Sequence, residues 1–355
     1  MIRCWNILLI LSTGLACYLF YQSLQSQPGP GHHWSRNGGA ALSADGCSLV
    51  NIILLHSTMK ILKKEEFFKV VKMLQRCPWI ENPEEHKLLQ RNFQTCCNTS
   101  YSMIVTQENT EMGQTIQYEV EKRTKNVTEE LYNLFPKKSP FQKEIRSCAV
   151  VGNGGILNNS FCGNEIDRAD FVFRLNLPPL NWTNDVGTKT DLVTANPSIL
   201  LNKFRGLRKE KEPFITMVKE YGSSMILLPA FSYSMNTEVS FRALYTIKDF
   251  DLKSRVVFFN PDYLRNLGAY FKSLGLKFQR LSSGLMMVSV AAEVCETVTL
   301  YGFWPFSEDL DGVWISHHYY DNVIPKPGFH SMSDEFYWYL QMHAQGSLRL
   351  KLGQC

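Results

Sequence analysis

Three of the eight histidines in this 355-residue chain, His317, His318 and His330, fall within one short segment. Histidine can act as a general base, or donate a hydrogen bond to a phosphate, without a metal ion. A shared zinc site is disfavoured, because two of the three are adjacent and no cysteine or carboxylate lies at the usual ligand spacing. His330 precedes Glu335 by five residues, which can place it at the mouth of a helix. We therefore expect the chemistry to reside in this segment.

A glycine-rich turn upstream has the features of a nucleotide site. Residues 148–157 read CAVVGNGGIL, an apolar strand that stops at three closely spaced glycines. The pattern predicts a helix to about residue 168 and a second strand at 171–175. Backbone amides in such a turn can approach a phosphate at a helix N-terminus. The order of these elements is typical of the opening unit of a doubly wound α/β sheet.

A dinucleotide cofactor is the weaker interpretation of this unit. Its usual motif has glycine at the sixth position, where this chain has Leu157, and an acid after the second strand. Here the second strand leads into Arg174, Asn176 and Pro178, without a carboxylate. A nucleotide-dependent oxidoreductase is therefore kept only as an alternative.

A second turn, at Ser282, Ser283 and Gly284, precedes the apolar run 285–295. The run predicts a buried helix capped by one of the two serines, followed by a short strand at 296–301. A serine-glycine turn that leads into a helix can hold an anion, and it can equally be an ordinary helix cap. The residues alone leave both readings open.

Composition and the N-terminus indicate the cellular compartment. The chain is 45% hydrophobic with a net charge of +4, which argues against a nucleic-acid-binding protein and against disorder. Its ten cysteines are many for a cytosolic chain. Arg3, followed by an apolar run that ends in aromatic residues, predicts an N-in, C-out signal anchor, with a cleavable signal peptide as the alternative. Both readings place the remaining chain in the secretory lumen or outside the cell.

The predicted organisation has four parts. They are a cytoplasmic tail at 1–6, a transmembrane signal anchor at 7–21, a flexible stem at 22–46 and a lumenal catalytic domain at 47–355. The stem is rich in Gly, Pro, Ser and Gln. Among four glycosylation sequons we expect glycans at Asn98, Asn126 and Asn181. Asn158 is disfavoured because it closely follows the glycine-rich turn.

Four segments in order, 148–193, 280–306, 317–322 and 330–335, resemble the large, small, third and very small motifs of animal sialyltransferases. The strings ADFVFRLNLPP, DVGTKTDLVTANPS, LSSGL, YGFWPF and HHYYDN, with the H-x4-E of the last segment, are similar to the α2,8-sialyltransferase branch. The resemblance implies a Rossmann-like sheet flanked by helices, a variant of the GT-A fold. It also implies a single catalytic domain on a type II anchor in the Golgi membrane.

The resemblance implies a reaction as well. Such enzymes transfer N-acetylneuraminic acid from CMP-sialic acid to a sugar hydroxyl, with inversion and through an oxocarbenium-like transition state. By motif position, His330 is the expected base for the acceptor hydroxyl and His318 the donor to the departing phosphate. The residues expected to contact CMP-sialic acid are Asn153, Asn176, Ser282, Ser283, Gly284 and Trp304.

The expected acceptor is a sialylated ganglioside or an O- or N-glycan, to which one or a few sialic acids are added. Long polymers are not expected, because basic residues between Arg242 and Arg280 are scattered and interleaved with acids. A catalytically silent sialoglycan-binding relative is the second alternative, although such a protein would be expected to lack His330 or the CMP contacts. A homodimer is left open.

The family acts without a metal cofactor, and this chain is expected to do so. Two D-x-D sequences, Asp249 to Asp251 and Asp309 to Asp311, are read as surface turns, because CMP carries only one phosphate to neutralise. The resemblance further implies two disulfides, Cys148–Cys295 and Cys162–Cys355, the first of which would hold the two nucleotide-facing turns together. The pairing of Cys47, Cys77, Cys96 and Cys97 stays open.

Overall fold

The computed structural model describes residues 42–55, 62–323 and 330–355. Residues 42–355 belong to one compact unit. The predicted anchor at 7–21 and most of the predicted stem lie outside the described residues. In the part of the chain that the structure describes, no helix is long and apolar enough to span a bilayer.

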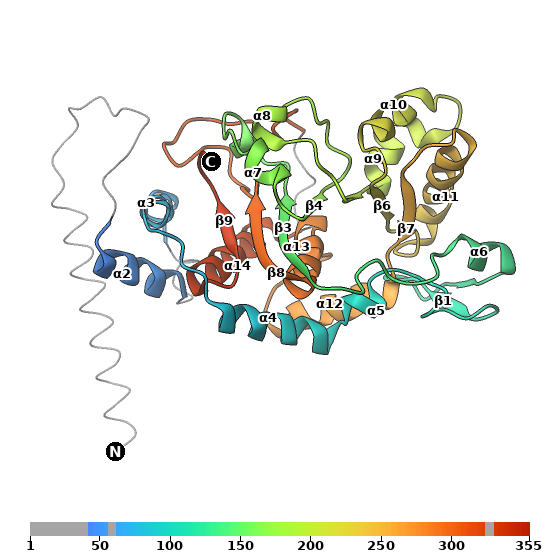
Figure 1. Ribbon diagram of the computed structural model, residues 1–355, viewed down its shortest axis with the longest axis horizontal. Helices are drawn as coiled ribbons and strands as arrows, with labels where there is room; N and C mark the ends of the chain where they lie inside the picture. The colour runs from blue at the N-terminus through green and yellow to red at the C-terminus, as the bar shows by residue number, and fades with distance from the viewer. Residues whose placement is uncertain (1–41, 56–61, 324–329) are drawn as a thin grey trace, which may run out of the picture. The chain divides into compact units, whose positions relative to one another are not determined.

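A seven-stranded parallel sheet lies at the centre of the unit (Figure 1). In spatial order its strands are β7 (Arg255–Phe258), β6 (Met225–Leu228), β5 (Leu192–Thr194), β4 (Phe171–Arg174), β3 (Ile145–Val151), β8 (Cys295–Tyr301) and β9 (Arg349–Lys351). Its inner strands are nearly continuous apolar runs, as expected for a parallel sheet that is covered on both faces.

The strand order reverses next to β3. From β3 the chain adds β4, β5, β6 and β7 in one direction, and then places β8 and β9 on the other side of β3. In open α/β sheets, ligands bind beyond the carboxyl ends of the strands at such a reversal. The ends of β3 and β8 therefore mark the expected ligand site.

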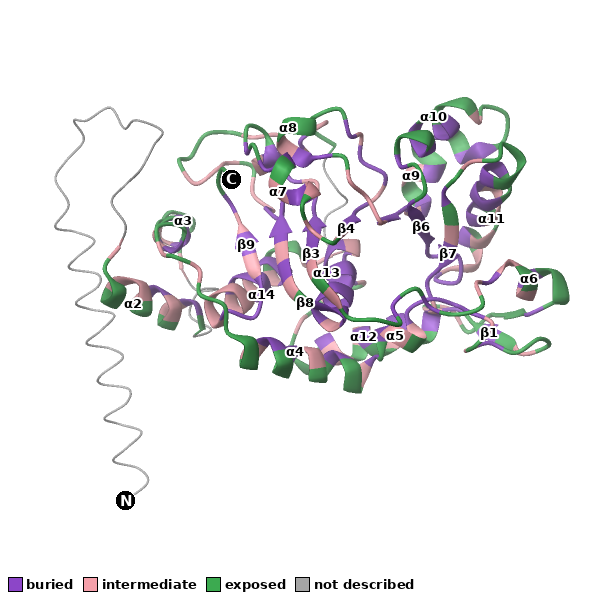
Figure 2. Cartoon of the chain, viewed as in Figure 1, coloured by how far each residue is buried: buried purple, intermediate pink, exposed green. Residues whose placement is uncertain are grey.

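Both faces of the sheet are covered by helices. Helix α13 (Ser283–Val294) is buried along almost its whole length and packs on β3 and β8. On the other face, Ala149 and Val151 of β3 join a cluster with α7 (Gly163–Asp167) and α8 (Thr183–Val186). Figure 2 shows the buried residues concentrated in the central strands and α13.

The remaining helices and the small hairpin surround this centre. They are α2 (Ala44–Leu55), α3 (Lys64–Gln75), α4 (Pro83–Cys96), α5 (Thr99–Ser102), β1 (Thr115–Gln117), β2 (Thr124–Asn126), α6 (Glu129–Leu134), the 3-10 helices η2 (Gly155–Leu157) and η3 (Arg205–Leu207), α9 (Pro197–Asn202), α10 (Glu212–Glu220), α11 (Ser234–Asp249), α12 (Pro261–Ser273) and α14 (Met332–Gln345). A large cluster of buried apolar side chains joins β5, β6 and β7 to α9, α10 and α11.

Most predicted elements form, with one clear difference. The helix predicted after the glycine-rich turn is reduced to η2 and the five-residue α7. Asn159 and Phe161 between them have φ of 61° and 56°, in the left-handed region that a right-handed helix cannot contain. The buried helix capped by Ser282 and the strand after it form as predicted.

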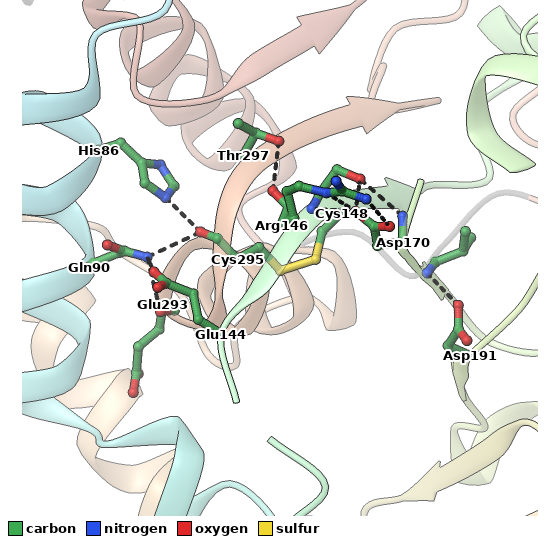
Figure 3. Close-up of a disulfide and its surroundings, with 12 residues drawn as sticks. His86, Gln90, Glu144, Arg146, Cys148, Asp170, Asp191, Glu293, Cys295 and Thr297 are labelled. Atoms are coloured by element: carbon green, nitrogen blue, oxygen red, sulfur yellow. Dashed lines mark hydrogen bonds and ion pairs between the residues drawn. A yellow bond between two sulfur atoms is a disulfide. The ribbon is translucent and has the colours of Figure 1, made fainter. Parts of the chain in front are cut away.

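The structure contains the two disulfides that the resemblance implied, Cys148–Cys295 and Cys162–Cys355. The other four cysteines pair as Cys47–Cys77 and Cys96–Cys97, the latter between neighbours in sequence. Cys148 lies within β3 and Cys295 begins β8, so their bridge joins the two strands and not, as expected, the turns (Figure 3).

Helix α4 is attached beside this bridge (Figure 3). His86 Nε2 lies 2.7 Å from the carbonyl oxygen of Cys295, and its Nδ1 lies 2.6 Å from that of Ser347. Gln90 Nε2 donates to the same Cys295 carbonyl at 3.1 Å. The amino-terminal end of β8 is therefore held by α4 as well as by the disulfide.

Candidate active site

The turns that follow β3 and β8 are joined directly at the reversal of strand order. Gly152 N–H donates to Tyr301 O at 2.7 Å, and Gly154 N–H donates to Gly302 O at 2.9 Å. A Cβ atom at either glycine would lie only 2.6 to 2.7 Å from Gly302 O. Glycine is therefore required for this close approach of two backbones.

Asn153 lies between these two glycines. Its Nδ2 donates to Leu175 O at the end of β4, at 2.8 Å. Its Oδ1 is buried and has no hydrogen-bond partner among the described residues. A buried carbonyl oxygen without a partner is costly, so this atom is well placed to accept a hydrogen bond from a bound ligand.

Asn176 continues the site past β4. Its φ of 64° is left-handed, a conformation that asparagine tolerates better than most residues. Its side-chain Oδ1 accepts from Asn196 N at 3.0 Å, and Asn196 Oδ1 in turn accepts from Ser283 Oγ at 3.1 Å. This chain of contacts connects the ends of β4 and β5 to the start of α13.

Ser282 is the N-cap of α13, where its Oγ accepts from Leu285 N at 3.0 Å. The buried carboxyl of Glu335, on α14, accepts from Ser282 N at 3.0 Å and from Ser282 Oγ. Burial raises the pKa of Glu335 to about 7, against the lowering effect of these hydrogen bonds. The serine-glycine turn is therefore held by the last helix of the chain.

His318 lies beside the glycine-rich turn. Its backbone forms an isolated antiparallel bridge with Gly154, and Tyr319 N donates to Asn153 O at 2.9 Å. The imidazole Nδ1 lies 2.7 Å from Asp321 Oδ1, and the ring stacks on Tyr320 with the centroids 5.1 Å apart. An ionised carboxylate only accepts, so Nδ1 carries the proton in this pair and Nε2 is directed away from it.

His330 lies just before α14 and is half-buried. Its Nδ1 is 2.8 Å from the carbonyl oxygen of Arg280. Because a carbonyl can only accept, Nδ1 must carry the proton and Nε2 is the basic nitrogen of the neutral ring. Burial lowers the pKa of His330 below its ordinary value of 6.5. The hydrogen bond to the Arg280 backbone acts in the opposite direction, and the Arg280 charge adds to the lowering.

Two predicted donor contacts differ in their surroundings. A Cβ at Gly284 would lie 3.0 Å from the ring of Phe303, so no larger residue fits there without a shift. Trp304 is 5% exposed, and its ring packs against Phe68 and Phe336. Its indole N–H donates to Glu308 O at 2.7 Å. The Trp304 side chain thus belongs to an aromatic cluster, and its contact with a donor stays a prediction.

Continuous contacts therefore join Asn153, Asn176, Ser283 and the His318 loop along the carboxyl edge of the sheet. Ser282 and His330 are attached to the same stretch through Glu335 and Arg280. Sequence reasoning missed the contacts by which four residues hold the others, namely Glu335, Asp321, Asn196 and Arg280. The first three lie inside quoted motif strings and Arg280 opens the segment 280–306, but no sequence pattern identified their contacts.

The other predicted sites lie elsewhere. Asn98, Asn126 and Asn181 are exposed, as is Asn158, which was disfavoured because a glycan there would crowd the donor site. Their occupancy stays a prediction. In the second D-x-D sequence, Asp309 Oδ1 accepts from the backbone N–H of Asp311 and Val313, and Asp311 pairs with Lys72. In the first, Asp249 lies 3.8 Å from Lys211.

The chain is similar in sequence to known proteins over most of its length. The model of glycosyltransferase family 29 (sialyltransferase) matches residues 104–347. An α-2,8-sialyltransferase 8F from Mus musculus is 45% identical over 82% of this chain and 74% of its own length. An α-2,8-sialyltransferase 8E from Rattus norvegicus is 45% identical over 85% of this chain and 82% of its own length.

Two further proteins are similar. An α-N-acetylneuraminide α-2,8-sialyltransferase from Xenopus tropicalis is 44% identical over 78% of this chain and 81% of its own length. The crystal structure of a mammalian sialyltransferase aligns with 82% of this chain over 87% of the solved chain, at 21% identity and a TM-score of 0.44. The family model and the relatives establish that this chain belongs to glycosyltransferase family 29, the sialyltransferases.

Proposed function

We propose that this protein transfers sialic acid from CMP-sialic acid to a glycan that already ends in sialic acid, forming an α2,8 linkage. The observation that carries the proposal is the joining of Asn153, Asn176, Ser283 and His318 at the reversal of strand order. Relatives named as α2,8-sialyltransferases support the linkage. The acceptor is a ganglioside or an O- or N-glycan that receives one or a few sialic acids.

His330 is the proposed general base. The Arg280 carbonyl fixes the proton on Nδ1, so Nε2 can take a proton from the acceptor hydroxyl as that oxygen attacks the anomeric carbon. The lowered pKa of His330 keeps the ring neutral above about pH 6.5, which a base requires. Attack from the face opposite CMP accounts for inversion.

His318 is the proposed donor to the departing phosphate. Asp321 holds the ring through Nδ1, and the ring lies beside the glycine-rich turn, where a phosphate would bind. Donation from Nε2 requires the imidazolium form of the ring, in which both nitrogens carry a proton. That donation would stabilise the negative charge that develops on the phosphate as the glycosidic bond breaks. Asn153 Oδ1 and the Ser282–Gly284 turn are the proposed contacts to the rest of the donor.

The test uses the full-length protein in detergent with labelled CMP-sialic acid. Acceptors are sialylated glycolipids and glycoproteins, each paired with its desialylated form, and the linkage is read by NMR. Transfer to the sialylated members with an α2,8 linkage is the expected result. Transfer only to the desialylated members, or to none, would contradict the proposal. If the chain is instead a catalytically silent sialoglycan-binding relative, it should transfer sialic acid to none of the acceptors and still bind CMP.

Metal independence is part of the proposal. Among the described residues, no three His, Cys, Asp or Glu side chains gather as a metal site. Histidine and backbone amides are sufficient in principle to stabilise a single departing phosphate. Full transfer in excess chelator is expected. Loss of transfer that is restored by manganese would contradict this part.

The proposed cellular setting is a type II protein of the Golgi membrane with a GT-A-like catalytic domain in the lumen. Four disulfides within the described residues support an oxidising compartment. Protease protection in sealed microsomes tests the topology. An epitope at the C-terminus should be protected and one at the N-terminus should be cleaved, and the reverse pattern would contradict the proposed orientation.

A further inference from the structure

Arg280 supplies the carbonyl that orients His330, so the position of Arg280 decides where that ring lies. The contact joins residues fifty positions apart, with His330 Nδ1 donating to Arg280 O at 2.8 Å. Two residues further on, Ser282 N donates to Glu335, which lies on α14, the helix that His330 directly precedes. The short segment from Arg280 to Ser282 is thus the surface against which His330 is placed.

The side chain of Arg280 is itself held tightly. Its guanidinium donates to Glu119 Oε2 at 2.9 Å and to Ser232 Oγ at 2.7 Å, and lies 5.8 Å from the ring centroid of Tyr233. The Arg280 and Glu119 side chains are only 14% and 10% exposed. Glu119 is the carboxylate that neutralises this largely buried cation.

Glu119 belongs to the tip of the β1–β2 hairpin, and backbone hydrogen bonds fix the tip. Glu119 N donates to Phe231 O at 2.9 Å, and Val120 N donates to Ser232 O at 3.2 Å. Arg265 also donates to Tyr118 O at 2.9 Å. The hairpin is therefore tied to the loop after β6, and it presents the Glu119 carboxylate to Arg280 from a rigid support.

We propose that Glu119 is a positioning residue for His330, acting through the buried Arg280 side chain and its carbonyl. The proposal rests on the proposed role of His330 as the base. If Glu119 loses its charge, Arg280 becomes a buried cation without its carboxylate and must move toward water. Its carbonyl moves with it, and a base displaced by about 1 Å can lose about 100-fold in rate.

The test compares Glu119→Gln with Glu121→Gln, a matched control in the same hairpin. Glu121 Oε2 accepts from Ser234 N at 3.2 Å, whereas Glu119 is the carboxylate that pairs with Arg280. Glu119→Gln is expected to lower kcat about 10- to 100-fold. The KM for CMP-sialic acid and the Kd for CMP should change by less than about threefold. Glu121→Gln should retain wild-type kcat.

Glu119→Asp separates positioning from folding. It keeps the carboxylate in a shorter side chain, so it should recover a large part of the kcat that Glu119→Gln loses. CMP binding by all variants verifies a folded donor site. The proposal is overturned if Glu119→Gln keeps wild-type kcat, if it lowers CMP affinity as much as kcat, or if Glu121→Gln loses equal activity.

A failure of the proposed function would look different. Wild-type protein that transfers no sialic acid, or a His330→Ala variant with full transfer, would remove the premise, because Glu119 would then have no base to position. An active wild type with an inactive His330→Ala and a fully active Glu119→Gln would overturn the positioning role alone.

Discussion

The two histidines of the site are held in opposite ways. His318 is fixed within its own loop, by Asp321 three residues later and by stacking on Tyr320. His330 is fixed by the Arg280 carbonyl, which lies fifty residues earlier and depends on Glu119 still further upstream. The proposed phosphate donor, His318, is therefore oriented by residues close to it in sequence. The proposed base, His330, is oriented by residues that reach it only through the tertiary fold.

Removing the base should have the largest effect. His330→Ala leaves the acceptor hydroxyl without a proton acceptor, so transfer should fall by about 10²- to 10⁴-fold. CMP affinity should be preserved, because the proposed role of His330 is toward the acceptor hydroxyl and not toward the donor. Transfer kinetics and calorimetric titration of CMP measure both quantities. Retained transfer would remove His330 from the mechanism.

Removing the phosphate donor should cost nearly as much. His318→Ala deletes one hydrogen bond to the developing phosphate charge, which is expected to lower kcat by about 10²- to 10³-fold. The fold should be retained, since the loop backbone stays attached to Gly154 and Asn153. Thermal unfolding is the control. A variant with wild-type kcat would indicate that His318 is only a packing residue.

The contribution of Glu335, which holds Ser282, to the stability of the fold should depend on pH. Glu335 has a folded pKa of about 7 against 4.5 when unfolded, because burial disfavours its charge. Its contribution to stability is complete below pH 4.5 and is lost as pH rises to 7, a change of about 3 kcal/mol. Glu335→Gln stays neutral, so its destabilisation relative to wild type should shrink between pH 5 and pH 8. Urea titrations at both pH values measure it, and a constant difference would contradict the buried, raised carboxyl.

Loss of the contact between Asp321 and His318 should have a smaller effect on kcat. Asp321→Asn keeps the shape of the side chain but removes the charge that orients His318, a loss of about 1.5 kcal/mol or roughly 10-fold in kcat. His318→Ala serves as the reference for complete loss of the phosphate donor. If Asp321→Asn lowers kcat as much as His318→Ala does, Asp321 does more than orient the His318 ring, which would contradict this smaller expected effect.

The smallest effect concerns the acid limb of the pH profile. Burial lowers the pKa of His330 below 6.5, so kcat/KM should keep more than half of its plateau value at pH 6.5 and reach half only at a lower pH. Initial rates in buffers of constant ionic strength give the profile. A half-maximal kcat/KM at or above pH 6.5 would contradict the lowered pKa of His330.

Sequence patterns were sufficient for the local features of this molecule. The strand before the glycine-rich turn, the Ser282 cap and the buried helix could be predicted because each depends on neighbours in the chain. The shortened helix after the turn could not, since the left-handed residues at Asn159 and Phe161 have no sequence signal that competes with a helical pattern.

The site divides in the same way. Motif order identified His318 and His330, but the contacts that give them direction involve Glu119, Arg280 and Glu335. These residues meet only when the hairpin, the start of α13 and α14 pack together. A long-range contact between common polar residues leaves no spacing pattern, which is why sequence reasoning missed it.

One measurement separates the two histidines most directly, namely the hydrolysis of CMP-sialic acid without acceptor, compared with transfer to a sialylated acceptor. Departure of CMP requires phosphate stabilisation in both reactions. When water captures the oxocarbenium-like centre, its proton can pass to the solvent, whereas a bound acceptor hydroxyl depends on the positioned base. His330→Ala should therefore lose transfer and keep most hydrolysis, while His318→Ala should lose both. Equal loss of both reactions in the two variants would contradict the division of roles.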